Sequence, residues 1–177
     1  MNVKEMAAIF DVLKAAYPYY FKQIDDPKLT LNLWASMFET ETPLEVASAV
    51  RTFINTDRTG YMPSIGIIKD IIAKSQMMGD LTEDEAWDRI RQAASNGLYN
   101  ADTEFAKLPD TLKAVVVSPE QLKDWASMDS ETFNSVVASN FRRSYRVQLD
   151  RKKELLMIPP SVQRALNFLN KPNEETL

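Results

Sequence analysis

The stretch TPLEVASAVRTFINTDRTGYMPSIGIIKDII, residues 42–72, contains the signals that decide the fold. Thr42, Pro43 and Glu45 form a capping-box pattern with proline in the first turn, so a helix is expected to begin here. Apolar residues recur behind it at three- and four-residue spacing, as on one face of a helix. The turn residues of NTDRTGYMP end this helix, and Ser64 is expected to cap the next one. The stretch therefore predicts two amphipathic helices joined by a loop.

Two further helices are expected before this stretch. Apolar residues follow helical spacing from Val3 until Pro18, which disfavours helical geometry at the residue before it. Asp26 is then an N-cap followed by proline, and Trp34 lies on the apolar face of the helix behind it. Four helices joined by short turns predict an N-terminal four-helix bundle over residues 1–77.

Aromatic residues crowd around the helix break at Pro18. Tyr17 and Phe21 are expected to fold over the open end of the bundle with their rings buried, and the Tyr17 hydroxyl is expected to be hydrated. Tyr19 and Tyr20 cannot both face inward in a locally extended chain, because neighbouring side chains point to opposite sides. At least one of them is therefore expected to be exposed to a partner.

The second half predicts a separate helical subdomain over residues 81–170, after a linker at residues 77–80. Capping patterns, turn residues and apolar spacing carry this prediction, and no alternating strand pattern occurs, so the fold class is all-α. The expected elements are a helix from Thr82 to a stop at Asn96-Gly97, helical turns at 105–107 and 111–117, a capping box at 118–121, one long helix from Ser130 to about Leu156, and a short helix from Val162 to Leu169. Residues 171–177 are expected to form a mobile tail.

The composition argues against most kinds of catalysis. The chain has no cysteine and no histidine, so zinc sites, thiol nucleophiles and histidine acid–base chemistry are not available. Its four glycines lie far apart and form no phosphate-binding loop. The sequence therefore predicts a protein that is not an enzyme, with no catalytic residue, no metal and no cofactor. Without a membrane span or a signal peptide, and without cysteine, the protein is expected in a reducing cytoplasm.

The net charge of −4 is distributed unevenly along the chain. Residues 79–130 carry 11 acidic and 5 basic side chains, whereas residues 131–177 carry 8 basic and 5 acidic ones. Such a gradient is typical of a protein that meets other macromolecules, although a dedicated DNA-binding protein is usually basic overall.

One dense basic cluster is the first candidate for partner binding. Its members lie on the predicted long helix: Arg142, Arg143, Arg146, Arg151, Lys152 and Lys153. They are expected to contact either phosphates or an acidic partner, or else to form a solvated helix end, where cations are favoured. No aromatic stripe accompanies the arginines, so stacking on single-stranded bases is unsupported.

The remaining candidates have structural interpretations beside the functional ones. The acidic run from Asp80 to Asp88 begins a helix, where carboxylates serve as caps. The three tryptophans lie on apolar helical faces and are expected in the core. Tyr61 and Met62 are large apolar residues in a turn. Burial against the base of the bundle is the favoured interpretation, and if exposed they form a partner-binding knob.

The runs VLKAAYP, LNLWASMF and LEVASAVRTFINTDRTGYMPSIGIIKDI follow one another within residues 9–73. In this order they resemble the helicase loader and inhibitor family of phages that infect Gram-positive bacteria. The runs EAWDRI, FAKLPDTLKAVV, LKDWASMD and VVASNFRRSYR are similar to downstream segments of related phage replication proteins. In the family the helicase-binding portion is a flexible C-terminal region, whereas residues 82–169 here are expected to fold. No helicase-contacting residue is therefore transferred.

The resemblance implies a small all-helical viral protein that takes part in DNA replication without hydrolysing ATP. It would bind and inhibit a hexameric replicative helicase and deliver it to an origin-bound replication protein. Two alternatives remain open from the residues: a replisome organiser that binds origin or duplex DNA through the basic helix, and a phage interaction or host-takeover protein with no replication role. Direct DNA binding is expected to be weak at most, and no membrane is expected to be a partner.

Overall fold

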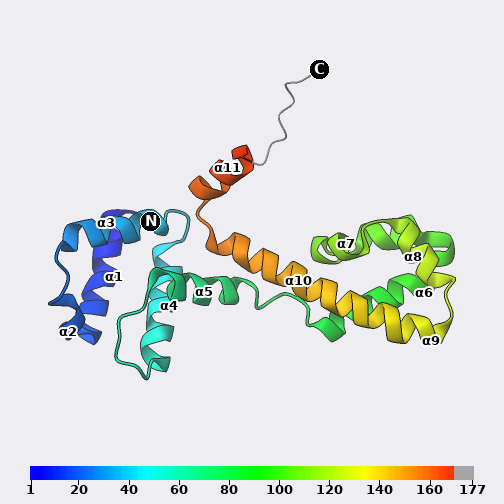
Figure 1. The fold of residues 1–177 in the computed structure, drawn as a ribbon, viewed down its shortest axis with the longest axis horizontal. Coiled ribbons are helices and arrows are strands. Elements are labelled where there is room, and N and C mark those ends of the chain that lie inside the picture. The colour runs from blue at the N-terminus through cyan, green and yellow to red at the C-terminus, as the bar shows by residue number, and fades with distance from the viewer. Residues whose placement is uncertain (170–177) are drawn as a thin grey trace, which may run out of the picture. The chain divides into compact units, whose positions relative to one another are not determined.

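The structure is a computed structural model, and it describes residues 1–169. Every regular element in these residues is a helix, which confirms the predicted all-α class. The chain divides into two compact units, shown with their helices in Figure 1. The first unit holds residues 1–78 and the described residues from Lys153 onward, and the second unit holds residues 79–152. Each unit is described by itself below.

Residues 1–78 form five helical elements, three of which begin where the sequence predicts caps. The elements are α1 (Val3–Ala16), the single turn α2 (Pro18–Phe21), α3 (Pro27–Met37), α4 (Pro43–Thr56) and α5 (Ile65–Gln76). Thr42 and Glu45 form the predicted capping box, and Asp26 and Ser64 each accept a hydrogen bond from a first-turn N–H. A capping box at Asn2, which was not predicted, begins α1.

Aromatic rings from α1, α3 and the break at Pro18 meet in the core of the first unit. The Trp34 ring packs edge-on against Phe10, with centroids 5.3 Å apart, and Phe10 makes the same kind of contact with Phe21 at 5.7 Å. Tyr17 is buried beside Phe53. The predicted burial of Tyr17 is confirmed, and Phe21 is half-buried against this core.

One ion pair is buried in this core. The Lys69 ammonium group on α5 donates to the Glu41 carboxylate just before α4, and both side chains are less than a tenth exposed. The Lys69 Nζ also lies 4.9 Å from the centroid of the Phe38 ring, which is a cation–π distance. This pair joins α5 to the segment between α3 and α4.

The second unit packs five elements around α6 (Glu83–Lys107). They are α7 (Asp110–Val116), α8 (Pro119–Ala126), the turn α9 (Ser130–Thr132), which leads into the π-helical segment η1 (Phe133–Val137), and α10 (Ala138–Met157), which extends beyond the unit. Trp87 on α6 contacts Phe133 and Phe141, with centroids 4.9 and 5.6 Å away. The Tyr145 hydroxyl donates to the Leu81 carbonyl oxygen at 2.9 Å, which holds α10 beside the start of α6. Figure 1 shows α10 running along α6.

Two local predictions for the second unit are wrong. Asn96-Gly97 does not end the helix, because α6 continues to Lys107 with a kink at Asn100. Gly97 is instead buried where α6 meets α8, and a Cβ atom there would lie 3.1 Å from the Leu122 carbonyl oxygen. Close packing, and not a turn, accounts for this glycine. Ser118 precedes α8 without making the predicted side-chain cap.

The long helix also differs in detail from its prediction. The helical path from Ser130 to Met157 is interrupted by the η1 segment, where the hydrogen-bond spacing widens by one residue. The short last helix, α11 (Pro160–Leu169), begins close to its expected start.

Residues from Lys153 onward group with the first unit, whereas the predicted second subdomain runs to residue 170. Lys153 pairs with Asp70 of α5, and the Ser161 N–H donates to the Glu39 carboxylate. These contacts join residues that are far apart in the sequence, so no local pattern predicts them. The expected tail at 171–177 lies outside the described residues.

Candidate partner-binding surface

The loop between α4 and α5 is ordered around the Asp57 carboxylate. This group accepts hydrogen bonds from the Thr59 hydroxyl at 2.6 Å, the Thr59 N–H at 2.9 Å, the Gly60 N–H at 3.0 Å and the buried Tyr17 hydroxyl at 3.0 Å. Gly60 has φ of +72°, which L side chains rarely adopt. Four donors on one carboxylate and a left-handed glycine fix the shape of the loop.

These hydrogen bonds shift the ionisation of both partners. The hydrogen bond from the Thr59 hydroxyl is the largest cause that holds the pKa of Asp57 below its ordinary value, and the one from the Thr59 N–H is the next. Two effects raise the pKa of Tyr17 to about 12: burial is the larger one, and the hydrogen bond to Asp57 is the next. The pair is therefore a neutral phenol donating to an ionised carboxylate at neutral pH.

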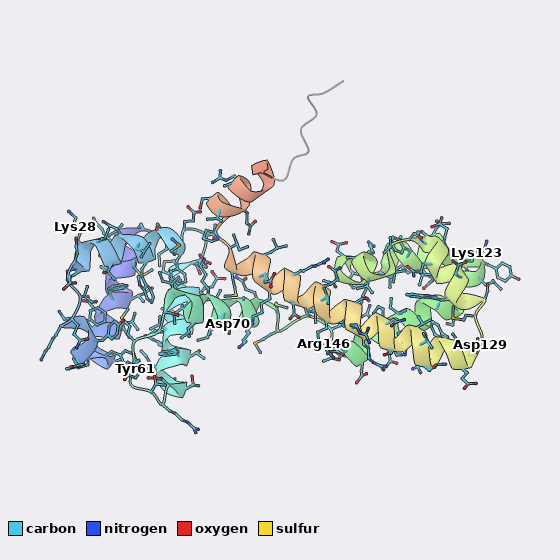
Figure 2. All side chains as sticks on the ribbon, in the orientation of Figure 1. Lys28, Tyr61, Asp70, Lys123, Asp129 and Arg146 are labelled. Atoms are coloured by element: carbon cyan, nitrogen blue, oxygen red, sulfur yellow. The ribbon has the colours of Figure 1, made fainter. Side chains whose placement is uncertain are left out.

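The ordered loop presents Tyr61 to solvent. Tyr61, labelled in Figure 2, is 70% exposed, so burial, the favoured interpretation of the sequence, is wrong for this residue. Met62 next to it is half-buried against the first core. Tyr19 and Tyr20 are both exposed, because the helical turn α2 replaces the expected extended segment. The first unit therefore leaves three tyrosines open to a partner.

An open groove of about 550 Å³ brings two of the predicted residues together. Tyr20 from α2 and Met62 from the ordered loop both line it, although they are far apart in the sequence. Its other apolar walls are Ile24, Leu29, Trp34, Pro63 and Ile65. Tyrosine, tryptophan and methionine are side chains that carry binding energy in protein interfaces.

The charged residues of this groove are acidic. Asp25 and Asp26 line it, and no lysine or arginine is among its lining residues. Asp26 also caps α3 by accepting the Leu29 N–H at 2.9 Å. An apolar groove bordered by carboxylates suits a protein segment that combines an apolar side chain with a cation.

The predicted basic cluster on α10 is largely neutralised by the chain itself. Within the second unit, Arg142 pairs with Asp84 at 3.1 Å, Arg146 with Glu83 at 2.9 Å, and Lys152 with Asp80 at 2.6 Å. Lys153, in the first unit, pairs with Asp70 (Figure 2 labels Asp70 and Arg146).

These pairs show that the acidic run does more than cap a helix. Its carboxylates, except those of Glu85 and Asp88, are partners of the cations on α10. The hydrogen bond from Arg146 lowers the pKa of Glu83 and raises that of Arg146. Arg143 and Arg151 are exposed, and among the described residues neither has an ion-pair partner.

The three tryptophans singled out from the sequence lie in or beside the two cores. Trp34 and Trp87 are 5% exposed and lie in the two cores, whereas Trp125 is half-buried beside Phe133. Among residues 1–169, no group of three acidic side chains converges as a metal site would require. No helix in this part of the chain is long and apolar enough to cross a membrane.

Three features of the first unit were missed from the sequence. Leu29, an apolar residue of α3 that was not singled out as a surface residue, is 65% exposed at the groove. The Asp57 hydrogen bonds had a signal in the Asp-x-Thr-Gly turn pattern. The buried pair of Lys69 had a weaker signal. Lys69 directly follows Ile68 on the apolar side of its helix, and a cation that is buried there requires a partner of opposite charge.

Comparison with known proteins finds a family match within residues 1–78. Residues 1–69 match the family model for the N-terminal domain of the helicase loader/inhibitor of phage SPP1. The match confirms the resemblance of this part of the chain to the phage helicase-loader family and covers both the groove and the ordered loop. No curated protein and no solved structure matches the chain significantly.

Proposed function

We propose that this protein is a phage DNA-replication accessory factor that binds a hexameric replicative helicase, inhibits it, and delivers it to an origin-bound replication protein. The match of residues 1–69 to the N-terminal domain of a helicase loader/inhibitor carries this proposal. The absence of any phosphate-binding loop from the sequence supports a role without ATP hydrolysis.

We further propose that the first unit contacts its partner through the groove and the Asp57-ordered loop. Four hydrogen bonds to Asp57 fix the loop backbone that carries the exposed Tyr61, and a pre-ordered loop loses little entropy on binding. Tyr19, Tyr20, Tyr61 and Met62 are the residues expected to make the contact.

The test uses the purified full-length protein and the purified hexameric helicases of the virus and of its host. We expect the protein to co-elute with one hexamer and to slow its unwinding of a forked duplex. Tyr20→Ala with Tyr61→Ala should weaken the complex. Leu44→Ala is the matched control, because Leu44 is 76% exposed on the same unit but lies outside the groove. No complex with either hexamer would refute the proposed function.

A further inference from the structure

Arg143, Val147 and Arg151 form an exposed stripe on α10. Val147 is 43% exposed, and both arginines are exposed without an ion-pair partner among the described residues. The spacing of four residues places all three side chains on one face of the helix. Along the helix axis the two arginines are about 12 Å apart, at about 1.5 Å per residue.

The stripe faces away from the core of the second unit. Phe141 and Tyr145 are buried, and each lies two residues before a member of the stripe. At about 100° per residue, two positions turn the side chain to nearly the opposite side of the helix. Arg142 and Arg146 lie one position from the core residues, which is why they reach the carboxylates at the start of α6. The fold thus uses one pair of arginines and leaves the other pair to solvent.

The surrounding charge disfavours a nucleic acid as the partner of this stripe. Residues 79–152 carry 13 acidic and 10 basic side chains, so the unit as a whole repels a polyanion. Two arginines contact few phosphates, so they would release few counterions on binding a duplex. The exposed Val147 between the arginines would meet no apolar surface on a phosphate backbone. An acidic protein segment satisfies both the charges and the valine.

We propose that the Arg143–Val147–Arg151 stripe binds an acidic segment of the helicase, with two carboxylates about 12 Å apart and an apolar side chain between them, as one helical face provides. This inference rests on the proposed function and assigns the chemistry of one contact within it. Arginine is suited to such a contact because its planar fork binds a carboxylate through two hydrogen bonds. The contact is separate from the groove of the first unit, whose charged residues are acidic.

The experiment compares two charge reversals in the full-length protein. Arg143→Glu with Arg151→Glu changes the stripe. Arg89→Glu with Lys123→Glu is the matched control, because it makes the same change in net charge at two exposed cations of the same unit that have no ion pair among the described residues. Affinity for the purified helicase is measured by biolayer interferometry at NaCl concentrations from about 50 to about 300 mM. Over this range added salt increasingly screens the attraction between exposed charges.

We expect the stripe variant to bind the helicase about tenfold or more weakly than wild type at low salt, and the control about as well as wild type. The affinity of the wild type should fall as salt rises, and that of the stripe variant should fall less. Val147→Ser should weaken binding without changing the salt dependence. All variants should keep the wild-type circular dichroism and melting temperature, because every changed side chain is at least partly exposed.

Two results would overturn the inference while leaving the proposed function in place. In the first, the wild type binds the helicase and the stripe variant binds it with the same affinity. The other is equal weakening by stripe and control variants, which would indicate net charge and not a defined contact. Salt-sensitive binding of a 20-base-pair duplex (a length of about two helical turns) that the stripe variant alone loses would assign the stripe to nucleic acid. A wild type that binds no helicase refutes the proposed function as well.

Discussion

Replacing Lys69 by methionine should destabilise the first unit strongly. Lys69 and Glu41 are each other's only ion-pair partners among the described residues, and their side chains are 5% and 7% exposed. Lys69→Met therefore leaves a carboxylate buried without a counter-ion, which is expected to lower the free energy of unfolding by about 3–5 kcal/mol. A domain of ordinary stability has about 5–15 kcal/mol in total, so this change removes a large share of it.

The same reasoning predicts a different result for the double replacement. Glu41→Leu with Lys69→Met removes both charges and leaves apolar side chains of similar size, so the unit should be about as stable as wild type or up to about 4 kcal/mol more stable. The loss of the contact between Lys69 and the Phe38 ring costs part of any such gain. The double variant keeps the prediction testable even where the single variant does not fold.

Hydrogen exchange read by mass spectrometry measures this effect in the first unit separately from the second. Peptides from α3 to α5 should lose protection in Lys69→Met, and peptides from α6 to α8 should not. Lys74→Met is the control, because Lys74 is 66% exposed in its pair with Asp70 and should change stability by no more than about 1 kcal/mol. A loss below about 1 kcal/mol in Lys69→Met, or a double variant less stable than Lys69→Met, would refute the view that an isolated buried charge is the dominant cost.

Three further changes test other parts of the structure. Burial raises the pKa of Tyr17 to about 12, so the neutral phenol stabilises the fold fully below pH 10, and this contribution is lost as the pH rises from 10 through 12; absorbance at 295 nm should show one late-titrating tyrosine, which disappears in Tyr17→Phe. Gly97→Ala gains about 1 kcal/mol of helix propensity but puts a Cβ atom 3.1 Å from the Leu122 carbonyl oxygen, and because rigid backbone opposes it we expect net destabilisation, seen as a lower urea midpoint. Trp34→Ala should cost about 3–5 kcal/mol, as for other large buried side chains, and an unchanged melting temperature would contradict its place in the core.

Local signals in the sequence predict where the helices begin. A capping residue and its partner three positions later act within one turn, so Thr42, Ser64 and Thr82 could be assigned without knowledge of the rest of the chain. Gly97 has the residue type of a helix stop, but its structural role comes from α8, which approaches it from 25 positions later. A single-sequence pattern has no access to that approach.

The candidate surface was predictable in its residue types and not in its arrangement. The acidic and basic clusters were both visible in the sequence, but the structure pairs them with one another, which withdraws Arg142, Arg146 and Lys152 from the set of free cations. Their pairing depends on α10 lying along α6, a consequence of packing between Trp87 and Phe141. Which cations remain free is therefore decided by tertiary structure.

The break at Pro18 links the folding of the first unit to its exposed tyrosines. Proline ends α1 at Tyr17, whose ring enters the core and whose hydroxyl reaches Asp57. The same carboxylate fixes the loop that carries Tyr61, so one buried aromatic residue helps to position an exposed one. After the proline, a single helical turn places Tyr20 at the groove that Met62 also lines. Burying Tyr17 therefore stabilises the fold and also orders the surface that we propose for partner binding. Tyr17→Phe should on this reasoning weaken the helicase complex, because it removes one of the four hydrogen bonds that order the loop carrying Tyr61 and Met62.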